Sequence, residues 1–114
     1  MMEVQCHCGN VSVTADYPPT EVTQCNCSTC RRYAAAWSYY APDEVSVSVR
    51  ETPTQTYCWG DEDIEFHHCP VCGCITHYVT TPKCAAKIVA INMRMADNGI
   101  LEKLPVRYVN GASF

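Results

Sequence analysis

Short runs of alternating hydrophobic and polar residues dominate the chain. Val11, Val13 and Ala15 alternate with polar neighbours, and the run Val45–Val49 alternates valine with serine throughout. A period of two places the hydrophobic side chains of such a run on one face, as in a half-buried β-strand. The sequence therefore predicts a strand in each of these segments, the second being the clearest in the chain.

Turn residues divide the remainder into further short segments. Between the Gly, Pro, Asn and Asp positions we expect strands over residues 22–23, 34–40, 56–59, 64–68, 74–79, 87–94 and 106–109. Ser28 is the expected N-cap of one helical turn over 29–33, and Asn98-Gly99 is expected to form a turn. No run approaches the length of a transmembrane helix. We predict a mainly β fold in a single domain spanning residues 1–114.

Three cysteines lie within the six residues Cys25-Asn26-Cys27-Ser28-Thr29-Cys30. Thiolates at this spacing can converge on one borderline-soft ion such as zinc without a large loop. A structural zinc takes four protein ligands, whereas a catalytic zinc keeps one position for water or substrate. We interpret Cys25, Cys27 and Cys30 as ligands of a catalytic zinc. The competing interpretation is a structural site whose fourth ligand comes from elsewhere in the chain.

Two further cysteine pairs have the spacing of zinc knuckles. Cys6 and Cys8 are separated by one residue, Cys69 and Cys72 by two, and a glycine that permits a tight turn follows each pair. Joining the two pairs gives a closed four-sulfur zinc site that ties distant segments together. Cys6 and Cys8 could instead join the central cysteines. Rubredoxin-type iron is a weaker alternative, because that site uses two C-x-x-C halves.

Three cysteines and four histidines lie outside these ligand positions. Cys58, Cys74 and Cys84 are expected to be small hydrophobic residues, with Cys74 the least settled because it closely follows a ligand. Neighbouring residues of a strand face opposite sides, so one of His67 and His68 should point inward and the other outward. We do not expect the histidines to bind metal.

The composition narrows the class of protein. Ten cysteines in 114 residues would also suit a secreted disulfide scaffold, but the first residues lack the basic flank and apolar core of a signal peptide. We therefore expect a reduced, cytoplasmic protein. The formal net charge is −4, and seven thiolates with two zinc ions would bring it to about −7. An acidic domain is a poor fit for nucleic acid, and the basic pair Arg31-Arg32 is too small to change that.

The cysteine motifs, in their order along the chain, carry a family resemblance. The motifs are Cys6-His7-Cys8-Gly9, Cys25-Asn26-Cys27-Ser28-Thr29-Cys30-Arg31-Arg32 and Cys69-Pro70-Val71-Cys72-Gly73. In this order they resemble the glutathione-dependent formaldehyde-activating enzyme family, which includes centromere protein V. Residues 92–94 and 104–107 also look like the C-terminal part of that family. The resemblance implies a small β-tent fold of short antiparallel sheets around zinc knuckles. It implies two zinc ions per chain, a structural one on Cys6, Cys8, Cys69 and Cys72 and a catalytic one on Cys25, Cys27 and Cys30. His68 and Cys74 depart from the family pattern.

The same resemblance implies the chemistry of a carbon–sulfur lyase. Such an enzyme makes or breaks the carbon–sulfur bond of a small thiol adduct such as S-hydroxymethylglutathione, with glutathione as co-substrate. Arg31 and Arg32 are candidates to bind the substrate carboxylates, or they form a solvated surface pair. Other candidate pocket residues, with core packing as the alternative for the aromatic ones, are Trp37, Tyr39, Tyr40, Asn92 and Arg94. The alternative function is a non-enzymatic zinc module that binds a protein or nucleic-acid partner.

Overall fold

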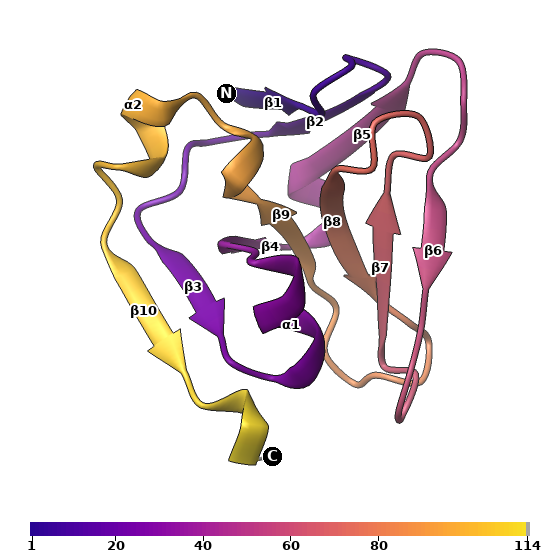
Figure 1. Cartoon of the computed structure of the whole chain (residues 1–114), viewed down its shortest axis with the longest axis vertical. Helices are drawn as coiled ribbons and strands as arrows, with labels where there is room; N and C mark the ends of the chain where they lie inside the picture. Colours follow the sequence, from indigo (N-terminus) through magenta and orange to yellow (C-terminus); the bar gives the residue numbers. More distant parts are fainter. Residues whose placement is uncertain (114) are drawn as a thin grey trace.

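The computed structural model describes residues 1–113, in which ten strands form two sheets (Figure 1). The smaller sheet has the order β1-β2-β5, built from β1 (Met2–Gln5), β2 (Val11–Ala15) and β5 (Val45–Val49). Both of its strand pairs are antiparallel. The mainly β prediction is confirmed, and so are the strands expected from the two clearest alternating runs.

The larger sheet has seven strands in the order β10-β3-β4-β9-β8-β7-β6. Their bounds are β3 (Val22–Cys25), β4 (Trp37–Tyr40), β6 (Gln55–Tyr57), β7 (Ile64–His68), β8 (Ile75–Thr80), β9 (Val89–Asn92) and β10 (Val106–Val109). Five neighbouring pairs are antiparallel, but β10 pairs with β3 in parallel. The expectation of antiparallel sheets is therefore wrong at this edge.

Short helices fill the connections between strands. They are α1 (Ser28–Tyr33), α2 (Asn98–Leu101) and the 3-10 turns η1 (Pro42–Glu44), η2 (Met93–Met95) and η3 (Gly111–Ser113). In the view of Figure 1, α1 is seen between the β3–β10 pair and the β7–β8 hairpin. Asn98 and Gly99 begin a short helix rather than a simple turn. None of the helices in the described residues has the length and hydropathy that crossing a membrane requires.

Two hydrophobic clusters form the core, and each contains cysteines. The first joins the two sheets through buried side chains that include Val4, Val11, Ile91, Cys6 and Cys69. The second lies in the larger sheet and consists of Cys30, Ala35, Trp37, Phe66, Tyr78 and Ala90, with Cys25 and Cys27 packed against it. Each cysteine group is thus held by its own part of the core, which fixes the backbone that presents the sulfur atoms.

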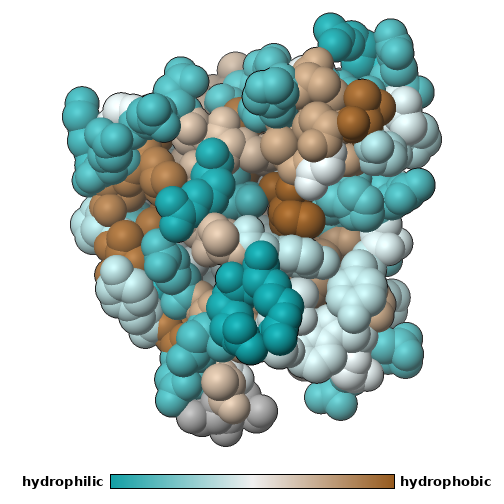
Figure 2. Space-filling view, viewed as in Figure 1, coloured by the Kyte–Doolittle hydropathy of each residue, from teal (hydrophilic) through white to brown (hydrophobic). Residues whose placement is uncertain are grey.

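The β5 strand differs from the expectation in its burial. Val47 and Val49 are 41% and 39% exposed, because β5 is the outer strand of the smaller sheet and only Val45 packs against the first cluster. Exposed hydrophobic side chains also gather beside α2 and the start of β10, where they are visible as brown atoms in Figure 2. Alternation therefore identified the strand without showing which valines reach the core.

Candidate functional site

Four cysteines from two hairpin turns come together at one end of the first core cluster. Cys6 and Cys8 lie in the turn between β1 and β2, and Cys69 and Cys72 lie in the turn between β7 and β8. The four sulfur atoms lie within 4.8 Å of one another. This grouping agrees with the pairing of half-sites made from spacing, and we refer to it as the four-thiol cluster.

The two turns of the four-thiol cluster have the same construction. Gly9 and Gly73 adopt φ angles of 80° and 82°, a left-handed conformation that suits glycine because it lacks a side chain. Their backbone N–H groups donate to the carbonyl oxygens of Cys6 (3.0 Å) and Cys69 (2.8 Å). Each turn therefore folds back on its first cysteine and presents the pair toward the other turn.

The sulfur spacing of this cluster fits a tetrahedral zinc ion. Zinc–sulfur bonds of about 2.3 Å in tetrahedral geometry would hold the sulfur atoms about 3.8 Å apart. The Cys8 Sγ lies 3.7 Å from both the Cys6 Sγ and the Cys69 Sγ. Burial alone would raise the pKa of the Cys72 thiol, but backbone donors at Cys74 and Cys8 lower it to about 6. The donor set therefore fits a closed site in which zinc binds thiolates.

Asn10 supports the four-thiol cluster, a role that the sequence reasoning missed. Its buried side chain donates from Nδ2 to the Thr52 carbonyl oxygen (2.8 Å) and lies 3.6 Å from the Cys69 Sγ. Its Oδ1 accepts hydrogen bonds from the backbone N–H groups of Glu51 and Thr52, both at 3.0 Å. Asn10 therefore links the loop after β5 to the thiols, and its position directly after the Cys-x-Cys-Gly turn was the signal available.

The three central cysteines form a second group at the start of α1. Cys25 ends β3, Cys27 caps the helix and Cys30 lies in its first turn. Their sulfur atoms lie within 4.8 Å of one another, and we call them the three-thiol cluster. Cys27, rather than the expected Ser28, is the N-cap, because its Sγ accepts a hydrogen bond from the Cys30 backbone N–H at 3.3 Å. Cys27 is therefore both a member of the three-thiol cluster and the cap of the helix.

The local electrostatics distinguish the members of the three-thiol cluster. Burial by itself raises the pKa of the Cys27 thiol, but hydrogen bonds from the Cys30 backbone and thiol reverse the shift and lower it. Burial raises the pKa of the Cys30 thiol to about 12. Because a bound cation favours thiolates, the cluster fits zinc or a similar metal ion with three sulfur ligands.

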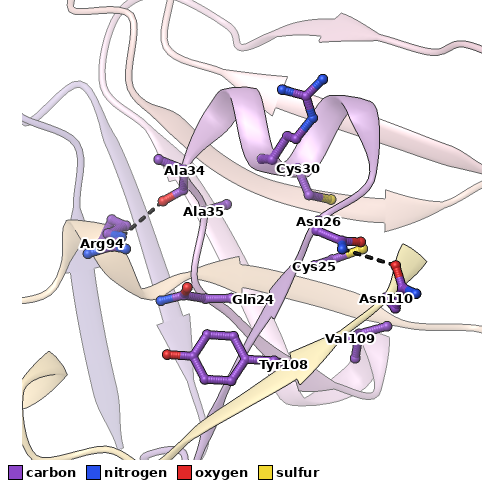
Figure 3. Close-up of a pocket in the computed structure, with 11 residues that line it drawn as sticks. Gln24, Cys25, Asn26, Cys30, Ala34, Ala35, Arg94, Tyr108, Val109 and Asn110 are labelled. Atoms are coloured by element: carbon purple, nitrogen blue, oxygen red, sulfur yellow. Dashed lines mark hydrogen bonds between the residues drawn. The ribbon is translucent and has the colours of Figure 1, made fainter. Parts of the chain in front are cut away.

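A first cavity of about 460 Å³ opens beside Cys25 and Cys30 (Figure 3). Arg31 and Arg94 line it, and we call it the arginine cavity. The Arg94 Nε donates to the Ala34 carbonyl oxygen at 2.9 Å, which fixes this guanidinium at the cavity wall. Of the two arginines expected to meet a substrate, Arg31 lines the cavity, whereas Arg32 donates to the Ser28 carbonyl oxygen and lies outside the lining residues.

A second cavity of about 550 Å³ is bordered by all three cysteines of the cluster. We call it the aromatic cavity, because its walls include Trp37, Tyr39, Trp59, Phe66 and Tyr78. Its remaining lining residues are Gly60, Asp61, Asp63, Ile64 and Gly111. The three-thiol cluster therefore borders two cavities that are lined by different side chains.

The segment after β10 closes one side of the three-thiol cluster, which sequence reasoning did not anticipate. The Asn26 side chain donates to the Asn110 Oδ1 and accepts from the Ala112 backbone N–H, both at 3.0 Å. Gly111, between these two contacts, lies directly against Cys25. The parallel pairing of β10 with β3 delivers this segment to the cluster.

Asn92 has a mainly structural role, whereas Arg94 lines the arginine cavity. The buried Asn92 side chain accepts from the Ala36 and Arg94 backbone N–H groups (3.3 and 3.2 Å) and donates to the Ile75 carbonyl oxygen (2.8 Å). These bonds connect β9 to Ala36, β8 and η2. Asn92 also lines a smaller cavity of about 310 Å³ together with Arg94, as the sequence led us to expect, but no cysteine of the three-thiol cluster borders that cavity. Tyr40 packs on Tyr17, away from the arginine and aromatic cavities.

The remaining histidines and cysteines make other contacts. Within the described residues, the two groups that could hold a metal ion contain cysteine alone. The His67 and His77 rings stack with centroids 4.3 Å apart, and His77 is buried. The Cys74 Sγ accepts from the His7 backbone N–H at 3.4 Å, and the Cys58 Sγ donates to the Ile64 carbonyl oxygen at 3.1 Å.

Comparisons with known proteins agree with this architecture. The family model described as glutathione-dependent formaldehyde-activating enzyme matches residues 1–108. A search of curated proteins finds no significant match. The crystal structure of a Rhodobacter sphaeroides protein, a structural-genomics target, is similar with a TM-score of 0.75 and 22% identity, over 93% of this chain and 100% of that one. At this identity the likeness shows the fold alone.

Fold and site together define a mainly β protein with one four-thiol and one three-thiol cluster, both suited to zinc. The family match extends over all seven of these cysteines. The chain belongs to the glutathione-dependent formaldehyde-activating enzyme family.

Proposed function

We propose that this protein is a zinc-dependent carbon–sulfur lyase that acts on a small thiol adduct, in the manner of an S-hydroxymethylglutathione synthase. The observation that carries the proposal is that the three-thiol cluster borders two cavities. In the four-thiol cluster, by contrast, Cys6 and Cys69 are buried within the core, and the four sulfur atoms would complete the coordination of one zinc ion by themselves. The two cavities therefore bring a ligand to the three-thiol cluster, and their lining includes none of the four-thiol cysteines.

The donor set supports sulfur chemistry. A zinc ion on Cys25, Cys27 and Cys30 would leave one position of four and would stabilise the sulfur of a bound substrate as a thiolate. Three thiolates give such a centre a net charge of about −1, which makes it a weak Lewis acid for water but a suitable one for soft sulfur. The site is therefore better suited to a thiol than to hydrolysis.

The arginine cavity supports glutathione as the thiol. Glutathione carries two carboxylates, and Arg31 and Arg94 supply two guanidinium groups beside Cys25 and Cys30. Because its Nε is bound to the Ala34 carbonyl oxygen, Arg94 can offer its two terminal nitrogens to a carboxylate without losing its position. In the forward reaction the glutathione sulfur bonds to the carbonyl carbon of formaldehyde, and the thiol proton ends on the former carbonyl oxygen. The reverse reaction breaks that bond.

Metal analysis combined with turnover tests the proposal. We expect two zinc ions per chain, and faster exchange between formaldehyde plus glutathione and S-hydroxymethylglutathione, followed by NMR. Cys27→Ser should abolish the acceleration, whereas Cys58→Ser, at an exposed cysteine outside both clusters, should retain it. Two zinc ions without any acceleration would instead favour a non-enzymatic zinc module with a macromolecular partner. A reducing, cytoplasmic location is part of the proposal, because both clusters need free thiols to bind zinc.

A further inference from the structure

The two cavities beside the three-thiol cluster differ in charge. The arginine cavity contains Arg31 and Arg94, and its lining includes neither Asp nor Glu. The aromatic cavity contains Asp61 and Asp63, and its lining includes neither Lys, Arg nor His. The carboxylates of a glutathione conjugate are therefore attracted to the first cavity and repelled from the second. Charge therefore favours the glutathione half of a conjugate in the first cavity and leaves the second cavity to the other half.

The walls of the aromatic cavity are built in two tiers. The inner rings of Trp37, Phe66 and Tyr78 are at most 8% exposed and hold one another at centroid distances of 4.8, 5.5 and 6.1 Å. The outer rings of Tyr39 and Trp59 are 41% and 45% exposed. A fixed inner wall with accessible rings at its rim is suited to receiving another flat apolar group.

The size of this cavity exceeds what formaldehyde requires. A volume of about 550 Å³ lies within the range of pockets for whole small molecules. The hydroxymethyl group that formaldehyde adds to a thiol has only one carbon and one oxygen. It is too small to fill this cavity and cover the rings of Tyr39 and Trp59. An aromatic or branched hydrocarbon group on the same carbon would fill the space and remove those rings from water.

We propose that the aromatic cavity binds the carbon half of the substrate, and that this half is a hydrophobic group, so that the preferred substrates are adducts of glutathione with hydrophobic aldehydes. The inference rests on the proposed function and extends it. The glutathione sulfur bonds to the aldehyde carbon, the π bond of the carbonyl group breaks, and the thiol proton ends on the oxygen. The product is a hemithioacetal, and no oxidant or reductant is needed.

Binding of two stable thioethers isolates the contribution of the cavity. S-benzylglutathione and S-methylglutathione both lack a thiol, so sulfur ionisation is absent from the comparison and only the carbon group differs. On the zinc-loaded protein we expect S-benzylglutathione to bind at least about tenfold tighter by calorimetry, because its ring is buried among aromatic side chains. Both tryptophans of the chain, Trp37 and Trp59, line this cavity, so the benzyl ligand should also change the intrinsic fluorescence.

Variants at the rim of the aromatic cavity test whether the preference for the benzyl conjugate arises there. Trp59→Ala and, separately, Tyr39→Ala should reduce the benzyl preference several-fold and leave S-methylglutathione affinity unchanged, because both side chains are partly exposed and lie in the lining. Tyr57→Ala is the matched control, since Tyr57 is an aromatic residue, 51% exposed, on the neighbouring strand β6 and outside the lining. Zinc content and thermal melts confirm that each variant is folded.

A charged ligand completes the test. S-(4-carboxybenzyl)glutathione should lose most of the benzyl advantage on the wild-type protein and regain part of it on the Asp61→Asn, Asp63→Asn double variant. Equal affinity for the benzyl and methyl conjugates would overturn the inference, and the proposed function would stand if formaldehyde exchange persists. Failure of both conjugates and of glutathione itself to bind the zinc-loaded protein would overturn both.

Discussion

Gly111 lies so close to Cys25 that a β-carbon at position 111 would overlap the Cys25 sulfur atom and sit 3.2 Å from the Cys27 β-carbon. The backbone on either side cannot easily move away, because Asn110 and Ala112 both bind the Asn26 side chain. Glycine is therefore required here for close approach rather than for an unusual φ angle. The segment after β10 acts as part of the wall of the three-thiol cluster.

Gly111→Ala should weaken zinc binding at the three-thiol cluster. The new methyl group must displace either the Cys25 sulfur or the segment after β10, and either movement spoils the sulfur geometry that a metal needs. We expect about a tenfold or greater loss of zinc affinity at this site, as for other residues that position metal ligands. Competition with a chromophoric chelator would measure it. Gly99→Ala, where nothing lies within 4 Å of the added β-carbon, is the control, and equal affinities in the two variants would contradict the argument.

Substitution of one cysteine in each cluster should separate their roles. Cys69→Ser breaks the four-thiol cluster, and structural zinc in such sites contributes on the order of 10 kcal/mol to folding, so this variant should unfold or aggregate. Cys27→Ser should leave a folded protein that binds one zinc ion fewer. Thermal melts and elemental analysis of both variants decide the point. Similar destabilisation in the two would mean that the structural and catalytic roles have been assigned wrongly.

The cysteine clusters could be predicted because their chemistry is local in sequence. Cys6-x-Cys8 and Cys69-x-x-Cys72 each turn on a glycine, and two such turns have few ways to complete a four-sulfur site. The alternating run Val45–Val49 identified β5 for the same reason, since a period of two is visible within five residues. The helical turn predicted over 29–33 corresponds to α1 (Ser28–Tyr33), although the sulfur of Cys27, rather than the hydroxyl of Ser28, caps it.

The surroundings of the clusters could not be predicted, because they depend on pairing between distant segments. Nothing in Val106–Val109 indicates a parallel partner in β3, yet that register is what brings Gly111 to Cys25. The aromatic cavity likewise combines residues of β4, β7 and β8 with the β6–β7 turn. Asn92 was expected at a pocket and does line one with Arg94, but only the fold shows that its amide is occupied by three backbone groups.

Stability should depend on pH through His77. Burial, with a smaller contribution from His67, lowers the pKa of His77 from 6.5 to about 3. The unfolded state therefore binds the proton more readily, so the contribution of this residue to stability is full above pH 6.5 and is lost as the pH falls from 6.5 toward 3. The slope should approach about 1.4 kcal/mol per pH unit in that range.

Comparison with His77→Gln isolates this dependence. Protonation of the zinc ligands also destabilises the protein in acid, but it acts on both proteins and cancels in the difference between their unfolding free energies. Denaturant titrations at several pH values should show the wild-type protein losing stability relative to the variant below pH 6.5. A constant difference across that range would show that His77 is not held neutral by burial.

The ligand at the three-thiol cluster should be a thiolate. If zinc on Cys25, Cys27 and Cys30 has one position for an exogenous ligand, soft sulfur matches it better than a carboxylate or phosphate does. Glutathione must lose its thiol proton to bind in this way, because the thiolate is the metal ligand. We therefore expect glutathione to bind with release of a proton, and S-methylglutathione, which cannot form a thiolate, to bind far more weakly.

The pH dependence of this binding has a definite sign. While the free thiol is protonated, each bound glutathione releases a proton, so affinity should rise with pH and level off above the thiol pKa of about 8.5. Calorimetry in buffers of differing ionisation enthalpy measures the released proton directly. Arg31→Ala should lower the affinity while leaving the proton release intact, because Arg31 lines the arginine cavity and, on this proposal, would bind a carboxylate of glutathione rather than its sulfur. Equal affinity for glutathione and S-methylglutathione, without proton release, would show that the sulfur does not bind the metal.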